Sequence, residues 1–184
     1  MSNSKESHIK CCFVGDDNVG MTSLIHSFMG LLFSDKVIPF QEELIIEHIS
    51  FNNTDFEMSY REIKDDSDQS QKYLHEANAL ISIFSFDIKE SLEHANKWLS
   101  YGCRLTDYYC REYLVETKCD LQERVYSYDE YYNISHSSNA SYYEVSNKTG
   151  SGIKQLKENI ISTYYSDTFK QEKRKQNKGE CQLV

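Results

Sequence analysis

The sequence predicts an α/β fold in which a mostly parallel, six-stranded sheet carries helices on both faces. Three observations support this prediction. Short apolar runs alternate along the chain with segments of helical periodicity, which is typical of βαβ units. A polar turn at Asn52–Asp55 joins two strand-like segments directly and so supplies a single antiparallel hairpin. The length of 184 residues suits one domain with its own core and a short appendage.

The N-terminal half begins with a buried strand. The apolar run Ile9–Val14 ends at a glycine, as a strand does before a tight turn. A helix is expected at Thr22–Met29, because its apolar residues share one helical face. The segments Leu44–Phe51 and Phe56–Ile63 form the two strands of the hairpin. The acidic, polar stretch Lys64–Ser70 is predicted to be a loop.

The C-terminal half repeats the alternation of strand and helix. A helix at Gln71–Ala79 leads into the most apolar strand, Leu80–Phe86, and a helix at Ser91–Leu99 has apolar residues at helical spacing. The remaining elements are strands at Tyr113–Glu116 and Tyr142–Val145, and helices at Ser127–Ile134 and Ser151–Tyr165. The chain beyond Asp167 is charged and without periodicity, so we expect a flexible tail.

The composition excludes several classes of protein. A formal net charge of −9 argues against a nucleic-acid-binding domain, which is usually basic. The chain contains no apolar run of about 18 residues that could span a membrane. Its first residues lack the apolar stretch of a signal peptide, so we expect a cytosolic protein. The six cysteines include no CxxC pair, so neither a zinc site nor a secreted disulfide framework is expected.

The turn after the first strand nearly matches the phosphate-binding pattern GxxxxGK[ST]. Its glycines, Gly15 and Gly20, allow the backbone to wrap N–H groups around an anion at a helix N-terminus. Thr22 is the candidate ligand of Mg²⁺, whereas the lysine of the pattern is replaced by Met21. The candidate phosphate-binding residues are Gly15, Asp17, Asn18, Val19, Gly20, Met21, Thr22 and Ser23.

Two further loops carry residues suited to a guanine base. After the strand Tyr113–Glu116 the chain reads Thr117-Lys118-Cys119-Asp120, in which the aspartate can accept both guanine N–H groups and the lysine stem can cover the ring. After the strand Tyr142–Val145 it reads Ser146-Asn147-Lys148, which offers backbone N–H groups to the guanine oxygen. Because parallel strands present their carboxyl ends at one edge of a sheet, we expect all three loops to share one site.

These motifs make the chain resemble the small GTP-binding proteins of the Ras superfamily. The resemblance runs from Ile9 to Tyr165 and is carried by "FVGDDNVGMTSLI", "ANALISIFSFDIKESLEHANKWL", "LVETKCDLQERVYS" and "YYEVSNKTGSGIKQL". The middle and last stretches are similar to Rab proteins, and the segment between Asp120 and Ser146 is too short for the helical insertion of Rho proteins. The resemblance implies a P-loop small G-protein domain over residues 1–167, GTP or GDP as the ligand, and effector or regulator proteins as partners.

The chain departs from the family's pattern at the phosphate end of the site. Met21 lacks the charge of the family's lysine, and losing a charge-assisted hydrogen bond costs about 1.5–3 kcal/mol, or roughly 10- to 150-fold in affinity. Asp17 stands where the family has a small residue, and its carboxylate would repel a phosphate charge by roughly 3 kcal/mol at an effective dielectric constant of about 20. The first switch, Val37–Glu47, contains no Thr or Ser for Mg²⁺, so metal binding is left open.

The second switch also departs from the pattern. By position, Arg61 replaces the metal-side aspartate, Lys64 replaces the glycine that senses the γ-phosphate, and Asp65 stands at the position of the glutamine that orients water. We therefore expect weak or absent GTP hydrolysis. Two alternatives stay open: a pseudo-GTPase that binds partners independently of nucleotide, and an active GTPase that uses Arg61 or Lys64 as a substitute cation.

Residues 168–184 are predicted to form a basic tail that ends in a lipidation motif. The last four residues, Cys181-Gln182-Leu183-Val184, fit the C-a-a-X pattern for prenylation of Cys181, with the choice of farnesyl or geranylgeranyl left open. A single lipid anchors a protein weakly, and basic residues add about 1 kcal/mol each on an anionic leaflet. The basic residues before the motif are Lys170, Lys173, Arg174, Lys175 and Lys178. We expect the protein at the cytoplasmic face of a membrane, with a soluble cytosolic pool.

Overall fold

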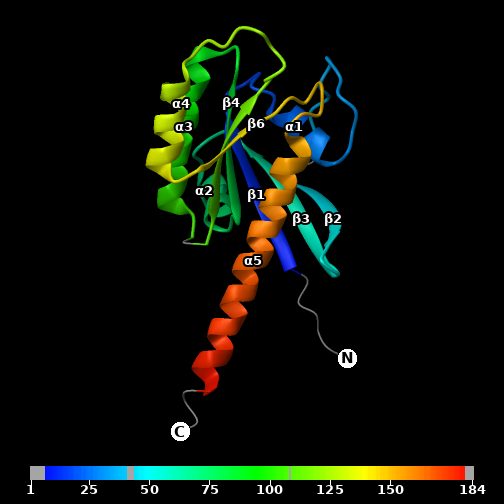
Figure 1. The fold of residues 1–184 in the computed structure, drawn as a ribbon, viewed down its shortest axis with the longest axis vertical. Helices are drawn as coiled ribbons and strands as arrows, with labels where there is room; N and C mark the ends of the chain where they lie inside the picture. The colour runs from blue at the N-terminus through cyan, green and yellow to red at the C-terminus, as the bar shows by residue number, and fades with distance from the viewer. Residues whose placement is uncertain (1–6, 41–43, 108, 181–184) are drawn as a thin grey trace.

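The computed structural model describes residues 7–40, 44–107 and 109–180, with residues 7 and 169–180 described by their backbone alone. The described strands form one sheet in the order β2-β3-β1-β4-β5-β6, in which only β2 and β3 pair antiparallel. The predicted six-stranded, mostly parallel sheet is therefore confirmed (Figure 1). The strands are β1 (Ser7–Gly15), β2 (Ile45–Phe51), β3 (Thr54–Ile63), β4 (Ala79–Ser85), β5 (Arg111–Thr117) and β6 (Ser141–Glu144).

Helices cover both faces of this sheet, as predicted (Figure 1). One apolar cluster joins α1 and α5 to the sheet through residues such as Leu24, Ile81 and Leu156. A second cluster joins α2, α3 and α4 to the opposite face through residues such as Leu74, Leu99 and Tyr131. The helices are α1 (Met21–Phe28), α2 (Asp68–His75), α3 (Lys89–Leu105), α4 (Tyr128–Ser138) and α5 (Ile153–Glu180).

The apolar run of the central strand and the polar hairpin turn explain why these parts of the sheet could be predicted from the sequence. All seven residues of β4 are buried, because helices lie on both sides of it. The hairpin turn consists of Asn52 and Asn53, whose φ angles of 49° and 61° are both positive. Asparagine tolerates this conformation better than most residues, and two positive φ angles suit the twist of a two-residue hairpin.

Two predicted boundaries are wrong around α2. The side chain of Ser67 accepts a hydrogen bond from the backbone N–H of Ser70, so the helix begins at Asp68, inside the stretch predicted as a loop. The helix ends at His75 rather than at Ala79, and Ala79 belongs to β4. The helix predicted at Ser91–Leu99 is also longer, since α3 continues to Leu105.

Helix α5 extends past the end of the predicted domain. Its backbone stays helical to Glu180, over residues for which the sequence predicts a flexible tail (Figure 1). The division of the chain at Asp167 stays a prediction. Within the described part of the chain, no helix has both the length and the apolar character needed to cross a membrane. Cys181, the predicted lipidation residue, lies outside the described residues.

Candidate functional site

The glycine loop between β1 and α1 forms a backbone cradle. Gly20 is the N-cap of α1 and has a φ of 88°, in the left-handed region that glycine adopts without strain. No side chain caps the first turn of α1, so its N–H groups are available to an external anion. Asp17 and Asn18 lie exposed on the loop, whereas Val19 and Ser23 are buried. The loop therefore has the backbone features that a phosphate-binding turn requires, and its role in binding stays a prediction.

Met21, at the position of the missing lysine, is part of the hydrophobic core. Its side chain is only 8% exposed and belongs to the apolar cluster shared by β1, β3 and α1. A neighbouring residue that the sequence did not single out, Asp16, contacts His94 of α3 at 2.6 Å between Oδ2 and Nδ1. The loop is therefore held by the packing of Met21 in the core and by the contact between Asp16 and His94.

The hydroxyl of Thr22 contacts a carboxylate that the sequence reasoning missed. Thr22 donates a hydrogen bond of 2.6 Å to Oε1 of Glu62, near the end of β3. The other oxygen of Glu62 lies 3.3 Å from Nζ of Lys64. Arg61 lies on the opposite face of β3, where its guanidinium carbon is 3.4 Å from the ring centre of Tyr73.

The expectation that Arg61 faces the metal position is therefore wrong, because successive residues of a strand point to opposite faces. Phe56, Met58 and Tyr60 lie in the core on the side of α1, and Glu62 continues this alternation. The period of two in β3 was the signal that could have identified Glu62. The assignment of Asp65 to the glutamine position stays a prediction.

The side chains around Thr22 do not fit the Mg²⁺ site that the family resemblance implies. Magnesium takes oxygen ligands in near-octahedral geometry, commonly one or two carboxylates plus substrate phosphates. Thr22 donates its hydroxyl proton to Glu62 and keeps lone pairs that a cation could use, but the second carboxylate oxygen of Glu62 faces the ammonium group of Lys64, whose positive charge opposes a divalent ion there.

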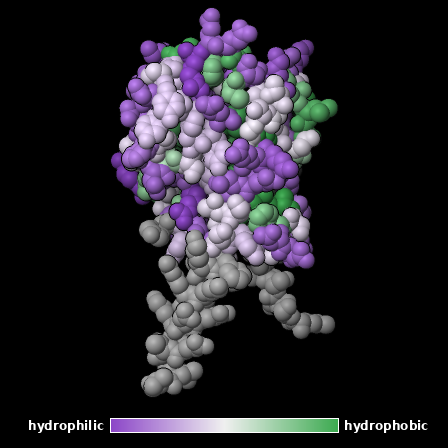
Figure 2. Space-filling view, viewed as in Figure 1, coloured by the Kyte–Doolittle hydropathy of each residue, from purple (hydrophilic) through white to green (hydrophobic). Residues whose placement is uncertain are grey.

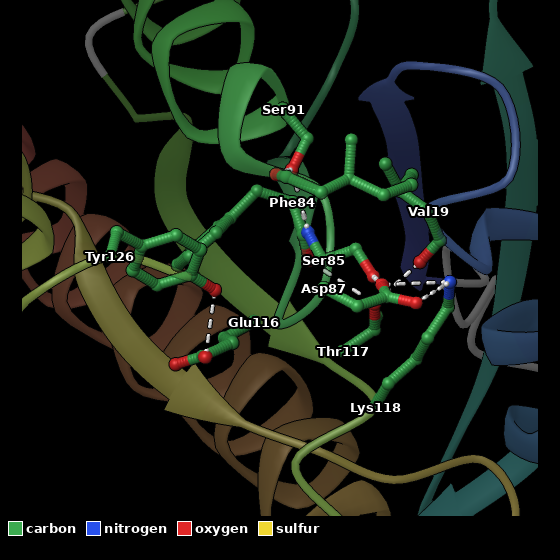
Figure 3. A network of polar contacts seen from close by, with 10 residues as sticks. Val19, Phe84, Ser85, Asp87, Ser91, Glu116, Thr117, Lys118 and Tyr126 are labelled. Atoms are coloured by element: carbon green, nitrogen blue, oxygen red, sulfur yellow. Dashed lines mark hydrogen bonds and ion pairs between the residues drawn. The ribbon is translucent and has the colours of Figure 1, made fainter. Parts of the chain in front are cut away.

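Both predicted guanine loops are joined directly to the glycine loop. Thr117 is fully buried, and its hydroxyl donates to the carbonyl oxygen of Val19 (Figure 3). The side-chain amide of Asn147 donates to the carbonyl oxygen of Gly20 at 3.1 Å. Hydrogen bonds therefore join three segments that are far apart in the sequence at the carboxyl ends of β1, β5 and β6.

The two residues predicted to recognise guanine are held in place by neighbours. Ser146 donates a hydrogen bond of 2.5 Å to Oδ1 of Asp120, which leaves the other carboxylate oxygen available to a ligand. Lys118 has a φ of 60°, and its Nζ lies 3.0 and 3.2 Å from the carboxylate oxygens of Asp87 (Figure 3). Lys148 is exposed on the neighbouring loop.

A buried carboxylate that the sequence reasoning did not single out supports the guanine loop from within. Glu116 immediately precedes Thr117 and is fully buried. It accepts a hydrogen bond of 2.7 Å from the hydroxyl of Tyr126 (Figure 3). It also accepts a hydrogen bond from the hydroxyl of Tyr142 and pairs with Arg124 at 2.9 Å. Burial raises the pKa of the Glu116 carboxyl despite these favourable contacts. The acidic residue at the end of an otherwise apolar strand was the available signal.

This raised pKa predicts how Glu116 affects stability. The folded protein binds the carboxyl proton more tightly than the unfolded chain does. The contribution of Glu116 to the free energy of unfolding is therefore fully present below the unfolded pKa of about 4.3. This contribution is lost as the pH rises through the raised pKa of the folded state. Urea unfolding from acidic to neutral pH should show that the free energy of unfolding of the wild type falls relative to that of Glu116→Gln as the pH rises. Glu123→Gln, at an exposed position, is the control, and parallel profiles for wild type and Glu116→Gln would contradict the prediction.

The segment after α1 exposes a group of apolar side chains. Figure 2 shows hydrophobic atoms at the edge of the molecule where this segment lies beside α1. The exposed residues are Leu31, Leu32, Phe33, Val37 and Ile38. An exposed apolar group of this kind is typical of a surface that contacts a partner.

The sheet order and the three joined loops define a small G-protein domain. Residues 10–166 match the family model described as the Ras family, so the chain belongs to the Ras family of small GTPases. The human Ras-related protein Rab-36 is 25% identical over 185 residues, an alignment that covers 95% of this chain and 68% of that protein. Membership of this family implies guanine-nucleotide binding and, in general, regulator and effector partners.

Proposed function

We propose that this chain is a membrane-anchored guanine-nucleotide-binding protein, acting in signalling or vesicle traffic, whose GTP hydrolysis is weak or absent. The observation that carries the proposal is the contrast between the two ends of one site. At the guanine end, Thr117 and Asn147 tie both recognition loops to the glycine loop. At the phosphate end, Met21 is buried and apolar.

The environment of Asp65 supports weak hydrolysis. Its Oδ1 accepts hydrogen bonds from the Ser70 hydroxyl at 2.7 Å and from the backbone N–H of Ser67 at 3.2 Å. The hydrogen bond from Ser70 is the main reason that the pKa of Asp65 is lowered. An ionised carboxylate engaged at the start of α2 cannot act like the family's glutamine, which orients water through a neutral amide.

The anchor is proposed from the sequence of the tail. Cys181 would carry the prenyl group, and the basic residues of the tail would add attraction to an anionic leaflet. Full-length prenylated protein should bind vesicles that contain phosphatidylserine, and Cys181→Ser should not. Equal binding by both proteins would contradict the anchor.

The nucleotide part of the proposal is tested by direct binding. Nucleotide extracted from the purified protein should be guanine nucleotide, and titration calorimetry should show binding of both GDP and GTP. Single-turnover assays should then release little phosphate from GTP. If neither nucleotide binds even at millimolar concentration, the proposal is wrong.

The alternative is a pseudo-GTPase interaction module, which two observations favour. Thr22, Glu62 and Lys64 already satisfy one another without a ligand, and the segment after α1 exposes apolar side chains to partners. In this case the protein keeps one conformation, and partner affinity is the same with GDP, with GTP and without nucleotide. Partners captured at equal yield in all three conditions would favour this alternative over the first proposal.

A further inference from the structure

The contacts of Glu62 bring a cation to the same carboxylate that binds Thr22, the residue that the family resemblance assigns to Mg²⁺. One oxygen of Glu62 accepts from the hydroxyl of Thr22, in the first turn of α1, and the other faces the ammonium group of Lys64 at 3.3 Å. The carboxylate is mostly buried, with 16% of its side chain exposed, whereas Lys64 is 67% exposed and retains room to turn. Glu62 therefore links an exposed positive charge to the first turn of α1.

The position that carries a lysine in the phosphate-binding pattern supplies no positive charge here. Met21 replaces the lysine of the phosphate-binding pattern, and the oxygens that would hold Mg²⁺ are engaged with each other and with Lys64. Two other cations discussed above contact groups of their own. Lys118 is paired with Asp87, and Arg61 lies over Tyr73 on the opposite face of β3. Of the cations named here, Lys64 is the one whose carboxylate partner also contacts Thr22, so it is the candidate to balance the charge of a bound diphosphate.

We propose that the ammonium group of Lys64 takes the place of Mg²⁺, so that the protein binds guanine nucleotide without a divalent cation. The inference rests on the nucleotide binding proposed above. Glu62 holds Lys64 near Thr22, and the phosphates attract the ammonium group as they enter the cradle. A tethered ammonium is a point charge with three donors, which suits phosphate oxygens. A divalent ion adjacent to it would be repelled.

The test is a titration of the full-length protein with fluorescently labelled GDP, in Mg²⁺ and in excess EDTA. The wild-type affinity should agree within about threefold between the two conditions. Lys64→Gln should lose about 10- to 150-fold in EDTA, as expected for a charge-assisted contact. It should recover part of this loss in Mg²⁺, because Glu62 is then free to serve the metal.

The matched control is Lys97→Gln, which removes a charge of similar exposure that pairs with Glu93 on α3. It should bind GDP like the wild type in both conditions. Calorimetric titration of Mg²⁺ into the GDP-bound wild type should give no binding heat, whereas Lys64→Gln should give a measurable one.

The outcomes separate this inference from the proposed function. A wild-type affinity that falls by more than about tenfold in EDTA would overturn the role of Lys64 and leave nucleotide binding intact. Unchanged affinity of Lys64→Gln in EDTA would also overturn it. Failure to bind GDP in either condition would overturn both, and circular dichroism would establish that each variant is folded.

Discussion

Replacing Met21 with lysine should tighten GDP binding by about 10- to 150-fold, the value of one charge-assisted hydrogen bond. Met21 begins α1 directly after the glycine loop, so a side chain at this position starts next to the predicted phosphate site. The lysine stem can keep the apolar contacts of the methionine while its ammonium group reaches toward the phosphates. Titration calorimetry of wild type and Met21→Lys with GDP measures the gain.

The control for this variant is Leu32→Lys, which adds the same charge at a side chain that is 93% exposed. It should leave GDP affinity nearly unchanged. Met21→Lys should also unfold at lower urea concentration without nucleotide, because Met21 is only 8% exposed and an unpaired charge is costly to bury. GDP should restore its stability by mass action. Equal GDP affinity of Met21→Lys and wild type would show that the cradle does not hold phosphates.

The fold could be predicted because its strongest signals are local. The continuous apolar run of β4 reflects burial on both faces, and the Asn52–Asn53 pair has the chemistry of a two-residue hairpin turn. The start of α2 was missed because an acidic, polar sequence resembles a loop until the Ser67 cap is recognised. The end of α3 was missed because Gly102 weakens the helical pattern, although it lets the helix approach Leu80 closely.

The parts of the candidate site that could be predicted are the loops that directly follow strands. Asp120, Ser146 and Asn147 lie together because the carboxyl ends of parallel strands meet at one edge of the sheet. Glu62 was missed because the alignment of the second switch with the family's motif assigned the metal position to Arg61. An error of one residue in a strand moves the assignment to the opposite face of the sheet. Glu116 was missed because its partners come from separate loops and from β6, which periodicity does not bring together.

Replacing Asp120 with asparagine should weaken GDP binding by about 10²- to 10⁴-fold. The carboxylate is expected to accept two guanine N–H groups, and each charge-assisted hydrogen bond contributes about 1.5–3 kcal/mol. The asparagine carbonyl can still accept from Ser146, so the loop should keep its position. Its amide N–H group, however, would oppose a guanine N–H group, donor against donor. The same amide can donate to the 2-oxo group of xanthine, so xanthosine diphosphate should bind Asp120→Asn more tightly than GDP does.

The reversal of base preference makes this prediction specific, because a variant that was merely unfolded would lose both nucleotides. Competition of GDP and xanthosine diphosphate against labelled GDP for the wild type, and against labelled xanthosine diphosphate for Asp120→Asn, gives the two preferences. Asp129→Asn removes the same charge from the exposed first turn of α4 and should leave the preference for guanine intact. If Asp120→Asn kept the wild-type affinity for GDP, the carboxylate that accepts from Ser146 would not be the group that recognises guanine. The nucleotide would then have to bind at a place other than the three joined loops.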